Sequence, residues 1–449
     1  MKRDASDQLV RQIGWRTAGA VVIANMVGAG VFTISGFLAR DLGSPWGILA
    51  LWLLGGMIAL AGGFAYAELG AAMPEAGGEY VYLREAYGLL VAYLSGWTSF
   101  FVGFSGALAA TLLGFAAYLS HVVDPFGAAP LDPKITALAT LWALTGAHLA
   151  GAGPGGRLQR ALTGATVAAI VALIVAGFAV GHGATANFCS SGPAAGNAAV
   201  SLIFVLYAYS GWNAAAYLAG EVREPERALA RALLGGTAVV IVLYLGLNLL
   251  YLYALPIPQM AGVLAIGEQA ARALFGKAAA RSVAAIIALA MLSSASAMVL
   301  AAPRVYYAMA RDRMLPRVFA DVNPRRHTPA RAILLQSTWT SVLILFFGAF
   351  EPIVLYTGFA VTAFAASAVA AVIVLRKRRP NLPRPFLMPG YPWLALAYVV
   401  VSLWTVVYAG VSRPFETLTG VITVCAGVPI YYLTNLWNGW RGVGCGRSR

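Results

Sequence analysis

The feature that most constrains this fold is the recurrence of apolar stretches of about 20 residues along the whole chain. A helix of this length crosses the ~30 Å hydrocarbon layer of a bilayer. Inside that layer the backbone must bond to itself, so α-helices are expected. Charged residues make up only 11% of the chain, against about 25% in an ordinary soluble domain. The sequence therefore predicts an all-α integral membrane protein.

Twelve such stretches are predicted to span the membrane. They cover residues 14–37, 46–70, 89–119, 135–151, 161–182, 198–220, 232–254, 280–306, 330–350, 353–375, 392–411 and 417–437. We predict that residues 14–182 form a first unit of five helices, residues 198–375 a second such unit, and residues 392–437 two additional helices. Residues 1–13 and 438–449 are the two termini.

Basic residues are gathered in four connections between the predicted spans. These connections follow spans 2, 6, 8 and 10 and include "EVREPERALAR" and "RKRRPNLPRPF". With an even number of spans, these loops lie on the same side as both termini, which the positive-inside rule assigns to the cytoplasm. The net charge of +14 thus orients a multi-pass protein in the inner (plasma) membrane and attracts anionic lipid. Nucleic-acid binding is not predicted.

Two of the predicted spans are interrupted near their middle. Gly28, Ala29 and Gly30 interrupt the first span, and Ser210 and Gly211 interrupt the sixth. These spans occupy corresponding places in the two five-helix units, and an odd number of helices makes the units inverted relative to each other. Paired interruptions in inverted repeats indicate a transporter's binding site. A single glycine pair would more simply mark close helix packing, but two matched interruptions favour discontinuous helices.

Unwound backbone inside a membrane needs a polar partner, and an amino-acid zwitterion supplies one. The half-helix that begins near Ala29 and Gly30 offers N–H groups and a positive dipole end to a carboxylate. The half-helices that end near Met26 and near residues 207–210 offer carbonyl groups to an ammonium. The candidate substrate-contact residues are Asn25, Met26, Gly28, Ala29, Gly30, Tyr207, Ala208, Ser210, Trp212 and Asn213.

Several of these side chains have two possible roles. Tyr207 and Trp212 either close over the substrate or pack between helices. Asn25 and Asn213 are amides at mid-membrane depth that must find partners, either on the substrate or on a neighbouring helix. The acidic residues and the lysines lie at span ends or in loops, whereas a charged substrate would need an opposite charge in the pocket. We therefore expect neutral amino acids, with a cationic amino acid or polyamine as the alternative, or a transporter-like sensor.

Four stretches of the sequence carry a family resemblance. They are "GAGVF" at 28–32, "AYAELGAAMPEAGGEYVYLREAYG" at 65–88, "YAYSGWN" with "EVREPER" within 207–227, and "PRVYYAMARDRMLP" at 303–316. Together they resemble the amino acid-polyamine-organocation superfamily and, within it, the L-type amino-acid transporters. The resemblance implies the leucine-transporter-type fold, a 5+5 inverted repeat with discontinuous helices 1 and 6. It also implies alternating access, as an exchanger or an ion-coupled symporter.

The resemblance also assigns roles to individual residues. The substrate carboxylate would meet the N–H groups of Ala29 and Gly30, and the ammonium the carbonyls of Met26, Tyr207 and Ser210. Tyr207 would be the gating aromatic residue, and Ala29 stands where many relatives have serine.

Coupling to Na⁺ or H⁺ is a further implication of the resemblance. Many relatives carry a lysine in span 5, where Thr166 stands here. Ser293 and Ser294 lie near the family's sodium site, although packing of serine between membrane helices is the simpler explanation of them. Exchange without an ion remains open, and no metal or other cofactor is expected.

Eukaryotic L-type members often pair with a glycoprotein through a cysteine in the loop after span 3. Here that loop, "HVVDPFGAAPLDPK", has none, so no disulfide-linked heavy chain is expected. Cys189, Cys425 and Cys445 form no CxxC motif. An enzyme is not favoured, because the histidines are scattered and "GAGPGG" at 151–156 lacks the preceding strand of a nucleotide-binding motif. A channel is not favoured, because no filter-like sequence is present.

Overall fold

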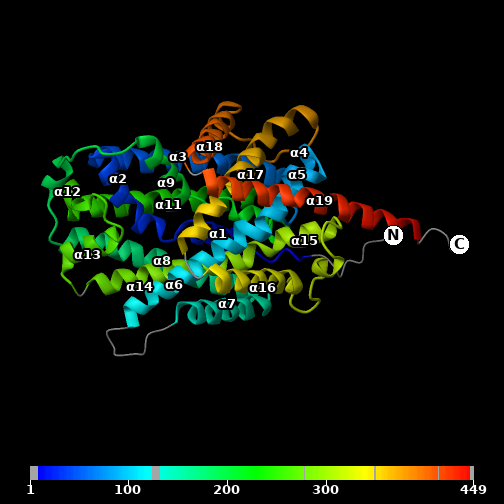
Figure 1. The fold of residues 1–449 in the computed structure, drawn as a ribbon, viewed down its shortest axis with the longest axis horizontal. Coiled ribbons are helices and arrows are strands. Elements are labelled where there is room, and N and C mark those ends of the chain that lie inside the picture. Colours follow the sequence, from blue (N-terminus) through cyan, green and yellow to red (C-terminus); the bar gives the residue numbers. More distant parts are fainter. Residues whose placement is uncertain (1–8, 124–131, 278, 348–349, 413, 445–449) are drawn as a thin grey trace.

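A computed structural model describes residues 9–123, 132–277, 279–347, 350–412 and 414–444. Within these ranges the regular structure is helical, with one isolated β-bridge and no strand. Long helices lie side by side along the length of the molecule (Figure 1). The predicted all-α class is therefore confirmed.

Six of the described helical segments are long and apolar enough to cross a membrane unaided. They are α3 (Pro45–Ala72), α5 (Leu89–Thr98) continuing into α6 (Phe104–Val123), α8 (Ala152–Val180), α11 (Pro225–Ala254), α14 (Ala279–Ala301) continuing into α15 (Pro303–Arg311), and the Thr417–Thr434 part of α19 (Pro414–Gly444). The other uninterrupted predicted spans correspond to α7 (Pro133–Leu149), α16 (Ala330–Phe347), α17 (Phe350–Arg378) and α18 (Trp393–Ser412). A membrane protein with several spanning helices is confirmed, and the total of twelve crossings stays a prediction.

Both predicted interruptions are present as breaks in the helix. The first span consists of α1 (Trp15–Met26), the 3₁₀ turn η2 (Gly30–Phe32) and α2 (Ile34–Leu42). The sixth consists of α9 (Ala198–Ala208) and the short α10 (Ala214–Tyr217), separated by a turn at residues 209–213. Glycine alone does not cause such breaks, because α3 carries four glycines in its middle and remains continuous.

A buried aromatic cluster backs both breaks. Trp52 of α3, Tyr209 beside the second break and Tyr244 of α11 have ring centroids 5.0 to 5.8 Å apart, and all three are buried. Edge-to-face and tilted ring pairs of this kind stabilise a fold beyond the contribution from the apolar area that they bury. The cluster holds α3, α9 and α11 together at the depth where α1 and α9 end.

Four of the basic loops meet at one end of the bundle, which we call the inner end. There the backbone of Ile13 exchanges hydrogen bonds with Glu221 and Arg223, both 2.8 Å long. Arg304 of α15 forms a fully buried ion pair with Glu221, and Arg84 of α4 (Glu79–Tyr87) pairs with Asp312 at 2.8 Å. The loops that the sequence places on one side therefore contact one another.

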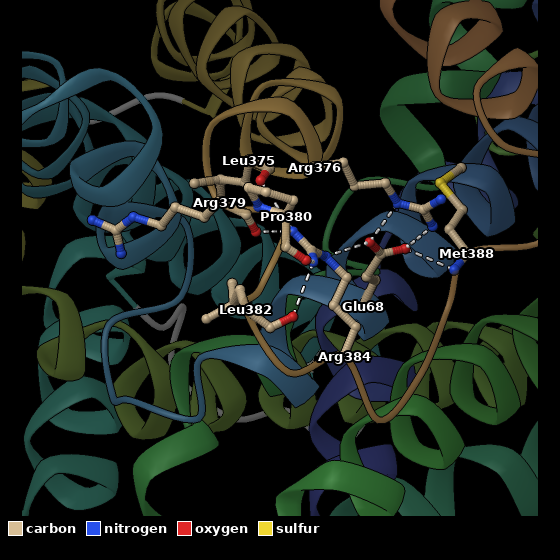
Figure 2. Close-up of polar contacts among 8 residues, drawn as sticks. All are labelled: Glu68, Leu375, Arg376, Arg379, Pro380, Leu382, Arg384 and Met388. Carbon is tan, nitrogen blue, oxygen red and sulfur yellow. Dashed lines mark hydrogen bonds and ion pairs between the residues drawn. The ribbon is translucent and has the colours of Figure 1, made fainter.

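Glu68 ties the fourth loop to this end (Figure 2). Its carboxylate accepts hydrogen bonds from Arg376 of α17 at 2.6 and 2.8 Å and from the Met388 backbone N–H at 2.7 Å. Arg384 approaches the same carboxylate and donates to carbonyls of the last turn of α17 and of the loop after it. Glu68 is therefore neutralised by arginine and is not available to a substrate.

Candidate functional site

The two helix breaks lie directly against each other. A β-carbon placed on Gly30 would lie 3.1 Å from the Ala208 β-carbon, so the first break touches the end of α9. Gly211 has a φ of +98°, and a β-carbon there would lie 2.7 Å from the Asn25 carbonyl oxygen. Only glycine tolerates both this backbone conformation and this close approach. The predicted pairing of the breaks is therefore present in space as well as in sequence.

The first break presents unpaired backbone donors. The N–H groups of Gly28, Ala29 and Gly30 take no part in the hydrogen bonds of the described backbone, and all three residues are only half-buried. A β-carbon on Gly28 would meet no heavy atom within 4 Å, so open space lies beside it. N–H groups at the start of a helix favour an anion.

The second break presents a carbonyl acceptor near these donors. The Ser210 carbonyl accepts no backbone hydrogen bond within the described chain, whereas the Tyr207 carbonyl faces the N–H groups of Tyr209 and Ser210, the latter at 3.0 Å. The Ser210 oxygen is therefore the more available acceptor of the two. These carbonyls are two of the three that the family resemblance assigned to the ammonium group.

The third assigned carbonyl already has a partner that the sequence did not reveal. The Tyr244 hydroxyl of α11 lies 2.7 Å from the Met26 carbonyl and 3.0 Å from the Ala208 carbonyl. Its one proton serves one of these acceptors at a time. Tyr244 thus joins the last turn of α1 to the last turn of α9. The sequence did contain a clue to this role of Tyr244. It lies one turn before Asn248 in an apolar span, and polar groups at such positions require hydrogen-bond partners.

The two candidate amides differ in their surroundings. The Asn25 side-chain oxygen is buried without a hydrogen-bond partner in the described structure, next to Gly211. An unpaired buried acceptor is costly, and it suits an ammonium donor. The Asn213 amide instead donates to the Tyr217 hydroxyl at 3.0 Å, which is a contact within the sixth span.

The two candidate aromatic residues also differ in their exposure and contacts. Tyr207 is 40% exposed even though it lies at the end of α9, and Ser210 beside it is exposed. Trp212 is buried, with its ring centroid 4.9 Å from that of Tyr66 and 5.6 Å from that of Tyr398. The position of Tyr207 suits a side chain that closes over a ligand, whereas Trp212 packs between helices.

A second polar cluster joins α1, α8 and α14. The Gln159 amide nitrogen donates to the Thr163 hydroxyl at 3.0 Å and to the Ser293 carbonyl at 3.2 Å. The Thr163 hydroxyl lies 2.8 Å from the Gln159 carbonyl of its own helix and 3.1 Å from the Ala20 carbonyl of α1, and its one proton serves one of these acceptors at a time. Sequence reasoning identified Ser293 here and missed Gln159 and Thr163.

Two of the predicted coupling residues lie beside this cluster rather than in it. The Thr166 hydroxyl donates to the Leu162 carbonyl of its own helix at 2.9 Å. Ser294 is buried in α14 next to Ser293.

Comparison with known proteins identifies the family to which the chain belongs. Residues 13–430 match the model of a family described as amino acid permease. The chain is 28% identical over 430 residues to the serine/threonine exchanger SteT of Bacillus subtilis (strain 168), across 94% of this chain and 97% of that protein. It is also 28% identical to the human cystine/glutamate transporter, across 96% of this chain and 86% of that one. The b(0,+)-type amino acid transporter 1 of Mus musculus is 27% identical, across 95% and 88%. A match through almost the whole sequence shows that the chain belongs to the amino acid permease family, whose members are transporters and not enzymes.

Proposed function

We propose that this permease exchanges neutral L-amino acids across the inner (plasma) membrane by alternating access. The observation that carries the proposal is the contact between the two helix breaks, with unpaired N–H groups on one and free carbonyl oxygen on the other. The substrate carboxylate binds the N–H groups of Ala29 and Gly30. Its ammonium binds the carbonyls of Tyr207 and Ser210 together with the Asn25 side-chain oxygen. Met26 and Ala208 shape the site through Tyr244.

The charge distribution supports a neutral side chain on the substrate. Every ion pair in the described part of the chain lies outside the two breaks. A cationic amino acid or polyamine needs an opposite charge in a buried pocket, and Glu68 is committed to Arg376. The head group is therefore held by backbone, and the side chain occupies an uncharged space.

Helix packing supports twelve crossings and the leucine-transporter-type inverted repeat. The two most extensive helix pairs are α3 with α11 and α6 with α14, which are the second span with the seventh and the third with the eighth. Corresponding helices of two units related by a pseudo-two-fold axis meet each other at that axis. The N-terminal side of α1 lies at the inner end with the basic loops, as the Ile13 contacts indicate, and an even number of crossings then places both termini in the cytoplasm.

Exchange without a coupling ion is supported by the cluster at Ser293. A cation site requires oxygen atoms that converge on one point. Here the oxygens of Thr163 and Ser293 converge on the Gln159 amide nitrogen, which is a neutral donor. We therefore assign Ser293 to helix packing through this amide, and assign Thr166 and Ser294, which lie beside the cluster, to helix packing as well.

Valine substitutions at two neighbouring threonines test this assignment. Thr163→Val removes a hydroxyl that accepts from the Gln159 amide and lies within hydrogen-bond distance of α1 as well as of its own helix. It is expected to slow exchange about 2- to 10-fold, because a hydrogen bond contributes about 0.5–1.5 kcal/mol. Thr166→Val, whose hydroxyl bonds to its own helix, is expected to stay within about twofold of the parent protein. Initial rates of exchange in liposomes measure both. Equal losses at the two positions would contradict the assignment.

The chain is proposed to act without a disulfide-linked partner. Cys189 and Cys425 are free and exposed. Cys445 and residues 124–131 of the loop after the third span lie outside the described residues. The absence of cysteine from that loop in the sequence supports the proposal.

Uptake of a panel of labelled amino acids by purified protein in liposomes tests the function. Saturable uptake of neutral L-amino acids that requires internal amino acid, with equal rates in sodium and choline chloride, is the expected result. Uptake that requires a Na⁺ gradient would identify a symporter. Binding without flux would identify a sensor, and preference for lysine or a polyamine would overturn the neutral substrate class.

A further inference from the structure

Glu79 is a buried acidic residue that the proposed transport cycle does not use. It is the first residue of α4 at the inner end and is 4% exposed. Its carboxylate accepts hydrogen bonds from the hydroxyls of Tyr66 at 3.0 Å and Ser95 at 3.2 Å, and Tyr217 supplies a third hydroxyl. These groups come from α3, α5 and α10, so the carboxyl lies where three helices meet.

The groups that face Glu79 carry no positive charge. The titratable side chains that interact with it are tyrosines of α3, α4, α10 and α18: Tyr66, Tyr82, Tyr217 and Tyr398. The described arginines of the helices packed around α4 are bonded elsewhere: Arg84 to Asp312, Arg304 to Glu221, Arg376 to Glu68, Arg378 to the Ala86 carbonyl, and Arg311 over the Tyr307 ring. A buried carboxyl without a cation is favoured in its neutral form.

Two chains of contacts lead from Glu79 to the second helix break. In one, Asn213 donates to the Tyr217 hydroxyl, which meets Glu79. In the other, the ring of Trp212 packs edge-on against Tyr66, which donates to Glu79. The loop before α4 fixes this arrangement, because a β-carbon on Gly78 would lie 2.6 Å from the Tyr217 ring. Any movement of α10 therefore changes the surroundings of the carboxyl.

We infer that Glu79 is a proton-binding site whose occupancy is linked to opening and closing of the inner end. The inference rests on the proposed transport function, in which the inner halves of the broken helices move away to release substrate. When α10 and Tyr217 move away, water reaches the carboxyl and its proton leaves to the cytoplasm. When the inner end closes, the carboxyl is buried again and takes up a proton from the same side. No net proton movement across the membrane results.

The direction of the pH dependence follows from burial. In the closed arrangement, removal from water raises the pKa of Glu79 above its ordinary value of 4.5, against the opposing effect of the three hydroxyl groups. In the hydrated open arrangement we expect an ordinary pKa. The closed state therefore binds more protons, and acid favours it. Between the two pKa values, each pH unit changes the ratio of closed to open protein by up to about tenfold.

Labelling of a cysteine at the inner end measures this ratio without transport. Thr17→Cys places the thiol on a buried face of α1, in a chain whose three native cysteines are serine. Labelling by a membrane-impermeant maleimide, corrected for thiol ionisation, is expected to speed up as pH rises. Glu79→Gln is expected to remove this dependence and to hold labelling at the slow acid level. Glu75→Gln, a control on the exposed carboxylate of the same loop, should keep the parental dependence.

A second variant keeps the test decisive if Glu79→Gln does not fold. Tyr217→Phe removes a hydroxyl that lowers the pKa of Glu79, so the midpoint of the labelling profile should move to higher pH. A folded Glu79→Gln protein with the parental pH profile would overturn the inference, as would an unmoved midpoint in Tyr217→Phe. Failure of the parent protein to exchange amino acids at any pH would instead overturn the proposed function.

Discussion

Gly30→Val abolishes amino acid exchange, because the two helix breaks have no room for a side chain between them. The added β-carbon would lie 3.1 Å from the Ala208 β-carbon and 3.3 Å from its α-carbon. The remaining methyl groups would push the breaks apart or fill the space that the substrate carboxylate needs. Overpacking of this kind costs about 1–3 kcal/mol. Initial rates of exchange in liposomes measure the loss, and Gly30→Ala should be intermediate.

Gly164→Val is the matched control for this substitution. Gly164 lies in α8, is exposed, and a β-carbon there would meet no atom within 4 Å. The control protein is expected to exchange at the parental rate. A well-folded Gly30→Val protein that exchanges normally would show that the carboxylate is not held at the first break.

Tyr244→Phe is expected to slow exchange by about tenfold. The lost hydroxyl lies 2.7 Å from the Met26 carbonyl and 3.0 Å from the Ala208 carbonyl. Its removal leaves buried acceptors unsatisfied, at a cost of about 1–3 kcal/mol, where about 1.4 kcal/mol corresponds to a factor of ten. It also separates the last turns of α1 and α9, so substrate affinity falls together with the exchange rate. Concentration dependence of exchange measures both quantities.

The chain offers a close control on the same helix. Tyr251 of α11 is also buried, but its hydroxyl has no hydrogen-bond partner in the described structure. Tyr251→Phe therefore removes the same atom without loss of a bond, and its exchange rate should match that of the parent protein. Equal effects of the two substitutions would show that the hydroxyl of Tyr244 does not hold the breaks together.

The helix breaks could be predicted from sequence because interruptions occur at corresponding positions of the first and sixth spans. Glycine content alone does not predict them. Glycine is as frequent in the middle of α3, at Gly55, Gly56 and Gly62, as it is at the first break. Nevertheless α3 stays helical. In α3 the missing side chains admit neighbours, among them Val205 and the Trp212 ring. One glycine-rich stretch taken alone does not separate glycine for packing from glycine for unwinding. The repeat of the interruption in the sixth span did.

Residues that act through contacts between distant helices were harder to predict. Tyr244 lies in an apolar span, where a tyrosine is equally consistent with packing, and its role depends on the meeting of α1, α9 and α11. Thr163 and Thr166 are three residues apart on one helix, so their side chains lie near the same face. Only packing against α1 and α14 distinguishes them. Glu79 lies between the second and third predicted spans, and its burial could not be predicted because it arises from three other helices.

A structure with a bound neutral amino acid tests most directly whether two broken helices hold the substrate head group by their backbone. We predict carboxylate oxygens about 3 Å from the backbone nitrogens of Ala29 and Gly30, and the ammonium at a similar distance from the Ser210 carbonyl oxygen. An amino acid bound elsewhere, with these groups still unpaired, would contradict the account.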